Sequence, residues 1–131
     1  MLADLDIVVP FHGRLDLVLR CVEALAANEP ISGQIILVDD RSPQDEVADC
    51  ARALQRLPLP IRWLRQQART GFVAAVNAGC ATCTKSTVLV LNNDAIVPRD
   101  LIRRVRNAFA ANARLDTSPR WGNSWSVCTN R

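Results

Sequence analysis

The sequence predicts an α/β fold: a doubly wound, mostly parallel sheet with helices on both faces. Four short runs, at residues 6–10, 34–38, 61–64 and 88–91, are predicted strands, and three of them are almost wholly apolar. Each run is followed by a segment with apolar residues at helical spacing. Strands that lack polar alternation are buried on both faces, which is typical of parallel sheets covered by helices. The 131 residues suffice for one domain with a modest core.

The first half of the chain predicts two strand–helix units. The first run stops at Pro10, and the helical segment after it ends at "NEPISG". The second run ends abruptly at Asp39-Asp40, after which Ser42 is expected to cap a helix that has Pro43 in its first turn. The apolar stripes of these helices are Leu15, Val18, Leu19, Val22 and Leu25 in the first, and Val47, Cys50, Ala51 and Leu54 in the second.

The second half repeats the pattern once "LPLP" has ended the second helix. "RTGFVAAVNAGCA" predicts a helix of small residues, entered through Gly71 and suited to close packing. After the fourth strand, Pro98 opens a basic helix with an apolar face. That face consists of Leu101, Ile102, Val105 and Phe109. We therefore expect one domain over residues 1–111 and an irregular tail over 112–131, where Ser, Thr, Asn, Pro and Gly dominate.

Composition excludes several classes of protein. The net charge of +3 is too small to indicate nucleic-acid binding, and no basic run is interleaved with stacking aromatics. No apolar run is long enough for a transmembrane segment, and the N-terminus lacks the positive region of a signal peptide. Five cysteines without framework spacing indicate free thiols in a cytoplasmic protein. Cys80 and Cys83 form a C-x-x-C, which is either a pair of packing positions or a metal-binding pair.

Polar clusters follow the strands, where ligands bind in open α/β sheets. The clusters are Phe11-His12-Gly13, Asp39-Asp40, Arg69-Thr70-Gly71 and Asn92-Asn93-Asp94. Asp94 suits a hard divalent cation, and Arg69 at a helix start suits phosphate. Three of the clusters also have a plain structural explanation: a strand-ending turn at Asn92–Asp94, a helix-entry loop at Asp39-Asp40, and a packing or hydrogen-bonding role for His12.

Four segments in order, "DIVVPFHGRLDLVLRCVEAL", "IILVDDRSPQDE", "RTGFVAAVNAGCA" and "VLVLNNDAIVPRDLI", resemble the nucleotide-sugar-binding half of a family 2 glycosyltransferase with the GT-A fold. The resemblance covers residues 4–110 and implies a role in cell-wall or polysaccharide biosynthesis. It implies a nucleotide-sugar site formed by Pro10, Phe11, His12, Asp39, Asp40, Arg69, Gly71, Asn92 and Asn93, with Asp94 binding Mg²⁺ or Mn²⁺. The Asn-Asn-Asp variant of the family's D-x-D element is similar to that of rhamnosyltransferase-like members, which favours a UDP- or dTDP-sugar donor.

The function implied is transfer of the sugar to an unknown acceptor, a glycan or a lipid-linked molecule. A cation on Asp94 would stabilise the departing nucleotide diphosphate without proton transfer. The family's second half supplies the acceptor site and a general base. Residues 112–131 resemble nothing in that half, so we expect a truncated chain, incomplete as a catalyst. The alternative is a non-catalytic remnant that keeps the fold and weak nucleotide binding.

Two further alternatives concern other parts of the chain. Arg103, Arg104 and Arg106 form either a solvated helix surface or a contact with an anionic membrane or lipid-linked acceptor, which would place the protein peripherally at the inner membrane face. A phospho-accepting receiver domain also has an acidic pair and an Asp before an apolar run. Here the acidic pair follows the second strand instead of the first, and no Lys follows Lys85, which argues against a receiver.

Overall fold

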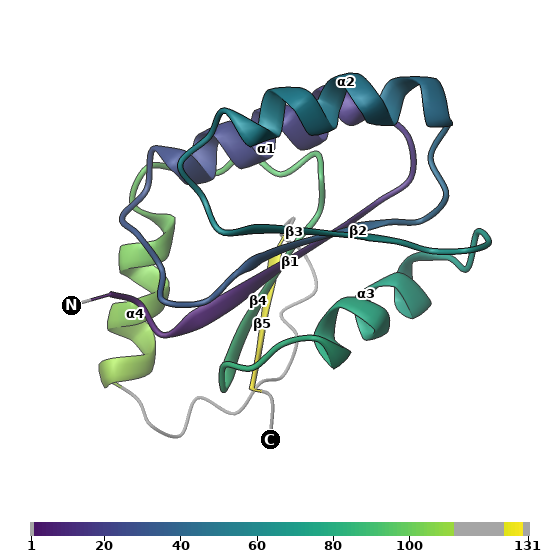
Figure 1. Cartoon of the computed structure of the whole chain (residues 1–131). Coiled ribbons are helices and arrows are strands. Elements are labelled where there is room, and N and C mark those ends of the chain that lie inside the picture. The colour runs from purple at the N-terminus through teal and green to yellow at the C-terminus, as the bar shows by residue number, and fades with distance from the viewer. Residues whose placement is uncertain (1, 112–124, 130–131) are drawn as a thin grey trace.

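The computed structural model of the chain describes residues 2–111 and 125–129. A five-stranded sheet with the order β3-β2-β1-β4-β5 forms its centre (Figure 1). The strands are β1 (Leu5–Phe11), β2 (Ile35–Asp39), β3 (Ile61–Arg65), β4 (Thr87–Leu91) and β5 (Trp125–Thr129). Strands β1 to β4 are parallel and β5 is antiparallel to β4. The predicted mostly parallel α/β sheet is therefore confirmed.

Helices cover both faces of this sheet, unequally. They are α1 (Leu15–Ala26), α2 (Gln44–Gln55), α3 (Phe72–Ala81) and α4 (Leu101–Ala111). Helices α1, α2 and α4 pack on one face and α3 on the other (Figure 1). Ile7 and Val9 of β1 belong to the core under α1, α2 and α4, whereas Val8 belongs to the core under α3. Alternate side chains thus enter two different cores, which is why the strand sequences are apolar throughout.

Helix α3 lies close against the sheet because it has small residues on its inner side. Ala75 and Gly79 are buried there. A Cβ atom on Gly79 would lie 2.6 Å from Val8 Cγ1 and 2.8 Å from Val38 Cγ2, so even a methyl group there would force its neighbours to shift. The prediction of a small-residue helix suited to close packing is confirmed.

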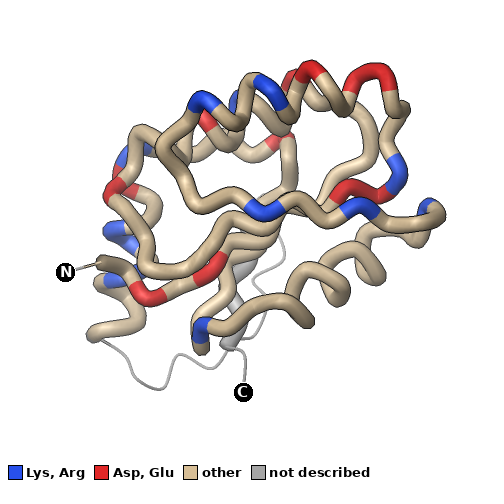
Figure 2. Tube along the Cα trace, in the orientation of Figure 1, with Lys and Arg blue, Asp and Glu red and all other residues tan. Residues whose placement is uncertain are grey.

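Buried Asp6 joins three segments at the amino ends of the strands. Its Oδ1 accepts a hydrogen bond from Gln34 N (2.7 Å), and its Oδ2 accepts from Thr84 N (2.9 Å) and Lys85 N (3.0 Å). Gly33 packs against the same carboxylate, where a Cβ would lie 2.2 Å from Asp6 Oδ1. Acidic residues lie at both ends of the central strands (Figure 2), and this one satisfies backbone N–H groups beside the entries to β2 and β4.

The last strand corrects one expectation. Residues 112–131 were expected to be an irregular tail, but 125–129 form β5, with Leu91 opposite Trp125 and Thr87 opposite Thr129. Backbone hydrogen bonding to the edge of β4 can order a segment that has no apolar period of its own. The rest of the expected tail, residues 112–124 and 130–131, lies outside the described residues.

Strands β1 and β4 separate at their carboxyl ends, and Pro10 accounts for the position at which their pairing ends. The β1–β2 pairing extends to Phe11 opposite Asp39, whereas the β1–β4 pairing ends at Val8 opposite Val90. Ile7 N donates to Gln34 O, so odd-numbered residues of β1 bond to β2 and even-numbered ones face β4. The Pro10 nitrogen therefore faces β4 and has no hydrogen to donate. The sheet opens at the point where strand order reverses, the usual ligand site of such folds.

Neither a membrane-spanning helix nor a protein-built metal cluster is found in the described ranges. No helix in them has the length and apolar character needed to cross a bilayer. No three His, Cys, Asp or Glu side chains among the described residues lie where they could hold a metal ion. Cys21 and Cys50 are free thiols inside the core, and burial raises the pKa of Cys21 to about 11.

The close packing of α3 leads to a test. Gly79→Ala should lower the free energy of unfolding by about 1–3 kcal/mol, because the added methyl overlaps two stiff valine side chains. This loss is expected although alanine is the better helix former by about 1 kcal/mol. Urea denaturation gives the value. Asn77→Ala, on the exposed side of the same helix, is the control and should leave stability unchanged or slightly raised. Equal or higher stability of Gly79→Ala would contradict the packing described.

Candidate functional site

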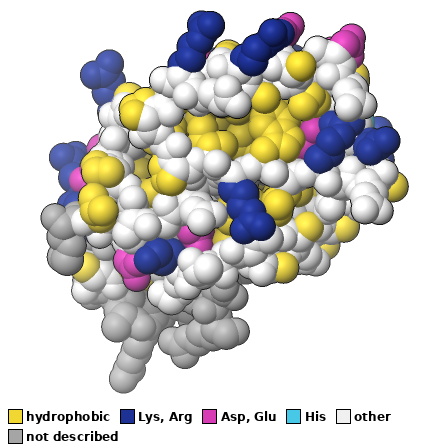
Figure 3. All heavy atoms as spheres, viewed as in Figure 1, with side chains coloured by type: hydrophobic (Ala, Val, Ile, Leu, Met, Phe, Trp, Pro, Cys, Tyr) yellow, Lys and Arg dark blue, Asp and Glu magenta, His cyan; other side chains and the backbone are white. Residues whose placement is uncertain are grey.

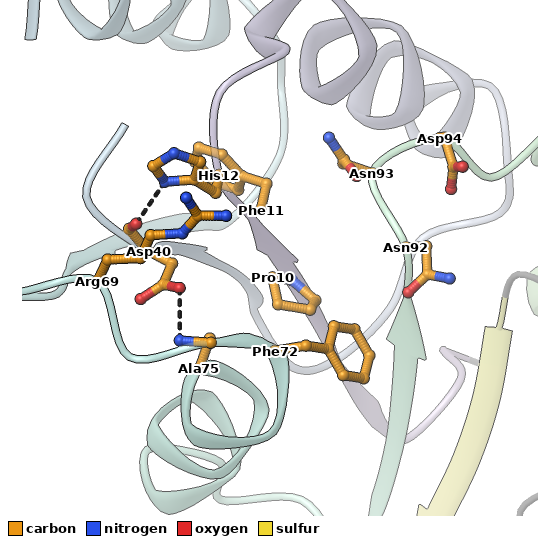
Figure 4. Close-up of a pocket in the computed structure, with 11 residues that line it drawn as sticks. Pro10, Phe11, His12, Asp40, Arg69, Phe72, Ala75, Asn92, Asn93 and Asp94 are labelled. Atoms are coloured by element: carbon orange, nitrogen blue, oxygen red, sulfur yellow. Dashed lines mark hydrogen bonds between the residues drawn. The ribbon is translucent and has the colours of Figure 1, made fainter. Parts of the chain in front are cut away.

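A cleft of about 520 Å³ lies at the carboxyl ends of the strands, where β1 and β4 separate (Figure 4). This volume is in the range of small-molecule sites. Its lining residues are Pro10, Phe11 and His12 after β1, Asp40 after β2, Arg69, Gly71, Phe72 and Ala75 around the start of α3, and Asn92, Asn93 and Asp94 after β4. The structure thus brings together every predicted site residue except Asp39.

Asp40 joins the end of β2 to the start of α3. Its Oδ1 accepts hydrogen bonds from Thr70 N (2.7 Å) and Thr70 Oγ1 (2.9 Å), and its Oδ2 accepts one from Gly71 N (2.8 Å). Gly71 has a φ of 91°, a conformation that L side chains rarely adopt. A carboxylate has about four acceptor positions, so Oδ2 keeps room for one more donor from a ligand.

These hydrogen bonds also set the charge state of Asp40. Burial disfavours the charged form and raises the pKa, but the hydrogen bonds from Thr70 and Gly71 outweigh it and hold the pKa of Asp40 below its usual value. A carboxylate with a lowered pKa in the folded state stabilises the fold above its unfolded pKa. That contribution is lost as the pH falls through the folded pKa. Asp40 is therefore a charged acceptor in the cleft at neutral pH.

Asp39 lies away from the cleft, which corrects its expected place in the site. Its Oδ1 accepts from Ser42 N (2.8 Å) and its Oδ2 contacts Arg65 Nη1 (2.6 Å). Arg65 Nη2 in turn donates to Ser42 O (2.8 Å). Successive strand residues point to opposite faces, so Asp39 enters the core under α1 and α2 while Asp40 turns to the α3 face. Asp39 thus stabilises the loop after β2 through Ser42 and Arg65, on the face of the sheet opposite α3.

Ser42 was expected to cap α2, but its hydroxyl is used elsewhere. Helix α2 begins at Gln44 without a side-chain cap hydrogen bond. Ser42 Oγ is buried and accepts from Gly13 N (2.8 Å), which joins the loops after β1 and β2. His12 Nδ1 lies 2.7 Å from Asp40 O, which joins the same loops a second time. His12 is thus a hydrogen-bonding residue whose ring lies at the mouth of the cleft.

The opposite wall of the cleft is the segment after β4. Ala95 N donates to Asn92 O (3.0 Å), so Asn92–Ala95 is also the strand-ending turn considered from the sequence. The Asn93 side chain points toward Phe11 and His12 across the cleft (Figure 4). Asp94 is exposed, and its hard carboxylate oxygens suit Mg²⁺ or Mn²⁺. No cluster of three ligands surrounds it within the described chain, so substrate oxygens and water would have to complete the coordination.

Phe72 and Ala75 line the cleft but were not predicted as site residues. Phe72 is 49 % exposed at the first position of α3, in a helix that is apolar on most sides. Periodicity therefore gave no sign of which apolar residue faces a ligand. A large apolar side chain left half exposed beside a polar cleft would have been the signal, and it appears only in three dimensions.

A second hollow, of about 260 Å³, differs in chemistry. It lies between α2 and β3 and appears as the yellow area beneath α2 (Figure 3). It is lined by Ala51, Leu54, Gln55, Leu57, Leu59, Ile61 and Trp63, none of which is charged. Trp63 contacts Phe11 edge to face, with 5.5 Å between ring centroids. Of these two hollows, the one at the carboxyl ends of the strands is the one lined by titratable groups.

The Asp40 network can be tested by isosteric replacement. Asp40→Asn should lower the free energy of unfolding by about 1–3 kcal/mol at pH 7, because an NH₂ group would face backbone donors. Since the pKa of Asp40 is lowered, the difference from wild type should shrink as the pH falls below about 3.9. Urea denaturation across pH measures both. Asp45→Asn, which neutralises an exposed carboxylate in the first turn of α2, serves as the control and should show smaller effects, since an exposed charge at a helix N-terminus contributes only about 0.3–1 kcal/mol.

Comparisons of the sequence with known proteins agree with the resemblance noted above. The family model described as Glycosyl transferase family 2 matches residues 6–125. A curated relative, the succinoglycan biosynthesis protein ExoO of Rhizobium meliloti (strain 1021), is 30 % identical over 115 residues. That match spans 86 % of this chain and 32 % of the relative, so the chain spans about a third of that protein's length.

Solved structures similar to this fold are glycosyltransferases. Mannosyltransferase PcManGT from Pyrobaculum calidifontis, in complex with GDP-Man and Mn²⁺, has a TM-score of 0.79 at 15 % identity, over 98 % of this chain and 45 % of that one. S. aureus TarS 1–349 in complex with UDP-GlcNAc has a TM-score of 0.75 at 13 % identity, over 84 % of this chain and 32 % of that one. At such identities the likeness shows the fold, which is that of GT-A glycosyltransferases. Together with the match over residues 6–125, it establishes that this chain belongs to glycosyltransferase family 2.

Proposed function

We propose that the cleft binds a nucleotide-diphosphate sugar, the donor for glycosyl transfer to an acceptor that is not identified. The observation that supports this most is the meeting of Asp94, two Asn residues and the Asp40–Gly71 wall around one cleft of about 520 Å³. The solved structures of PcManGT with GDP-Man and of TarS with UDP-GlcNAc support the same class of ligand.

In this proposal the two walls of the cleft bind different parts of the donor. Pro10, Phe11 and His12 lie against the base, and Asp40 uses its remaining acceptor position for a base or ribose donor. Arg69 is exposed beside Gly71 and suits an anionic diphosphate through its guanidinium. The carboxamide of Asn93 supports the ribose or sugar from the other side. A UDP- or dTDP-sugar is the proposed donor, by the resemblance of the Asn-Asn-Asp segment to rhamnosyltransferase-like relatives.

Asp94 is the proposed metal-binding residue of the donor site. Its carboxylate has the charge and hardness to bind Mg²⁺ or Mn²⁺, whereas the neutral amides of Asn92 and Asn93 lack the charge. The complex of PcManGT with GDP-Man and Mn²⁺ supports a divalent cation. A cation bound there would neutralise charge on the departing nucleotide diphosphate.

We also propose that the protein acts in the cytoplasm, because Cys21 and Cys50 are free thiols of the kind found in reducing compartments.

The basic surface of α4 is partly neutralised within the protein. Arg103 and Arg104 both contact Asp100, at 3.6 Å and 2.7 Å, and Arg106 contacts Glu29 at 2.7 Å. These ion pairs favour a solvated helix face over a membrane-binding one.

Calorimetric titration with UDP and dTDP, with and without Mn²⁺, tests the donor site. Wild-type protein should bind at least one nucleotide more tightly when Mn²⁺ is present. Asp94→Ala should lose about tenfold in affinity with Mn²⁺, or about 1.4 kcal/mol, and change little without it. Its stability should be unchanged because Asp94 is exposed.

Asp45→Ala removes an exposed carboxylate on α2 and is the matched control, for which binding should be the same as in wild type. Failure of the wild-type protein to bind either nucleotide at millimolar concentration would contradict the proposed function. Equal Mn²⁺ enhancement in Asp94→Ala would contradict the metal assignment alone.

A further inference from the structure

The segment just after α1 contacts the segment that forms the far wall of the cleft. Asn28 follows the end of α1, where the sequence predicted no more than a helix break. Its Nδ2 donates to Ala24 O (3.1 Å) within α1 and to Pro98 O (2.9 Å) across the molecule. Its Oδ1 accepts from Ile102 N (3.0 Å) in the first turn of α4. The side chain of Asn28 therefore links the end of α1 to Pro98 and to the first turn of α4.

The orientation of the Asn28 amide is fixed by these partners. Two carbonyl oxygens require the NH₂ group, and one backbone N–H requires the oxygen, so a flipped amide would lose all three hydrogen bonds. Ile102 N belongs to the first turn of α4, whose N–H groups have no partner within the helix. Asn28 thus caps α4 from a position 74 residues earlier in the chain.

The bond to Pro98 concerns the cleft more directly. Residues 92–100 connect β4 to α4, and the part from 92 to 98 includes the cleft residues Asn93 and Asp94. The start of this segment is fixed by the end of β4 and by the turn in which Ala95 N donates to Asn92 O. In the middle, Ala95 is buried and Val97 packs against the core, whereas Ile96 is 89 % exposed. The far end is fixed where Pro98 O accepts from Asn28 Nδ2 and from Leu101 N (3.2 Å).

Glu29 strengthens the same junction. Its Oε1 lies 2.7 Å from Arg106 Nη1, one helical turn beyond Ile102 on α4, in an ion pair between partly buried side chains. The consecutive residues Asn28 and Glu29 therefore contact two successive turns of α4. The apolar face of α4, with Leu101, Ile102 and Val105, is buried in the core beside them.

We propose that Asn28 is a positioning residue of the donor site. By fixing Pro98 and the first turn of α4, it sets the place of the segment that presents Asn93 and Asp94 to the cleft. This inference rests on the proposed function for its consequence, but its structural part can be tested without any ligand.

Asn28→Asp separates positioning from simple helix capping. The aspartate keeps the oxygen that accepts from Ile102 N, and its charge suits a helix N-terminus. It has no hydrogen to donate to Pro98 O or Ala24 O, and it places a negative charge beside both carbonyls. A residue needed only as a cap would be replaced successfully by Asp, whereas a residue that positions the 92–98 segment would not. Asn28→Ala removes both functions.

Two measurements decide. In amide hydrogen exchange, the Ala95 N–H of Asn28→Asp should exchange about tenfold faster than in wild type, while amides of β1 and β2 keep their protection. In titration with UDP and Mn²⁺, the Kd of Asn28→Asp should rise about three- to tenfold, with a much smaller change when Mn²⁺ is absent. Asp6→Asn is the control for general destabilisation, since Asp6 also accepts three backbone hydrogen bonds, at the opposite end of the strands. It should change neither Ala95 exchange nor the Mn²⁺ dependence.

The outcomes distinguish this inference from the proposed function. Wild-type exchange of Ala95 in Asn28→Asp would overturn the positioning role, whatever the nucleotide data show. Faster exchange with an unchanged Kd in the presence of Mn²⁺ would overturn the link between that segment and donor binding. No binding of UDP by wild-type protein would reject the proposed function, and the exchange experiment would still decide whether Asn28 fixes the segment.

Discussion

The cleft exists because β1 pairs over different lengths with its two neighbours. Toward β2 the ladder continues to Phe11, but toward β4 it ends at Val8, two residues before a proline whose nitrogen faces β4. The missing N–H removes the next ladder hydrogen bond. The chains leaving β1 and β4 can then diverge, and side chains from both loops line the space between them. The placement of the candidate donor site therefore depends on a backbone constraint in the central strand.

Buried carboxylates order the loops at both ends of the central strands. Asp6, Asp39 and Asp40 are all buried in or next to the central strands. Asp6 and Asp40 accept hydrogen bonds from backbone N–H groups of other segments, whereas Asp39 accepts one from Ser42 N in the loop after its own strand and contacts the Arg65 side chain. Charged acceptors form stronger hydrogen bonds than neutral ones, which offsets the cost of burial. The acceptor positions of Asp6 and Asp39 serve the fold. Asp40 supports the start of α3 and also lines the cleft, so this residue serves both the fold and the candidate site.

The sequence was most informative where burial on both faces left a continuous apolar run, because such runs define strands regardless of the rest of the chain. The sequence did not show which of Asp39 and Asp40 faces the cleft. A strand that is apolar throughout has no alternation of polar and apolar residues, so its sequence does not indicate which residues point to which face. β5 depends on pairing with a distant edge, and Asn28 acts on residues 70 and 74 positions away. Such contacts leave no local pattern. Phe72 was missed for a related reason, as its helix is apolar on most sides.

The charges of the cleft indicate how a donor and a cation would bind together. Asp40 and Asp94 bring negative charge and Arg69 positive charge to the lining, and no three-ligand cluster is present among the described residues. A cation bound by Asp94 alone would keep most of its water ligands. Oxygens of the bound diphosphate would therefore have to supply the rest of the affinity for the cation. Linkage then requires that the cation raise nucleotide affinity by the same factor as nucleotide raises cation affinity. The size of that factor depends on how firmly Asp94 is held, which connects binding at the cleft to the contact between Asn28 and Pro98.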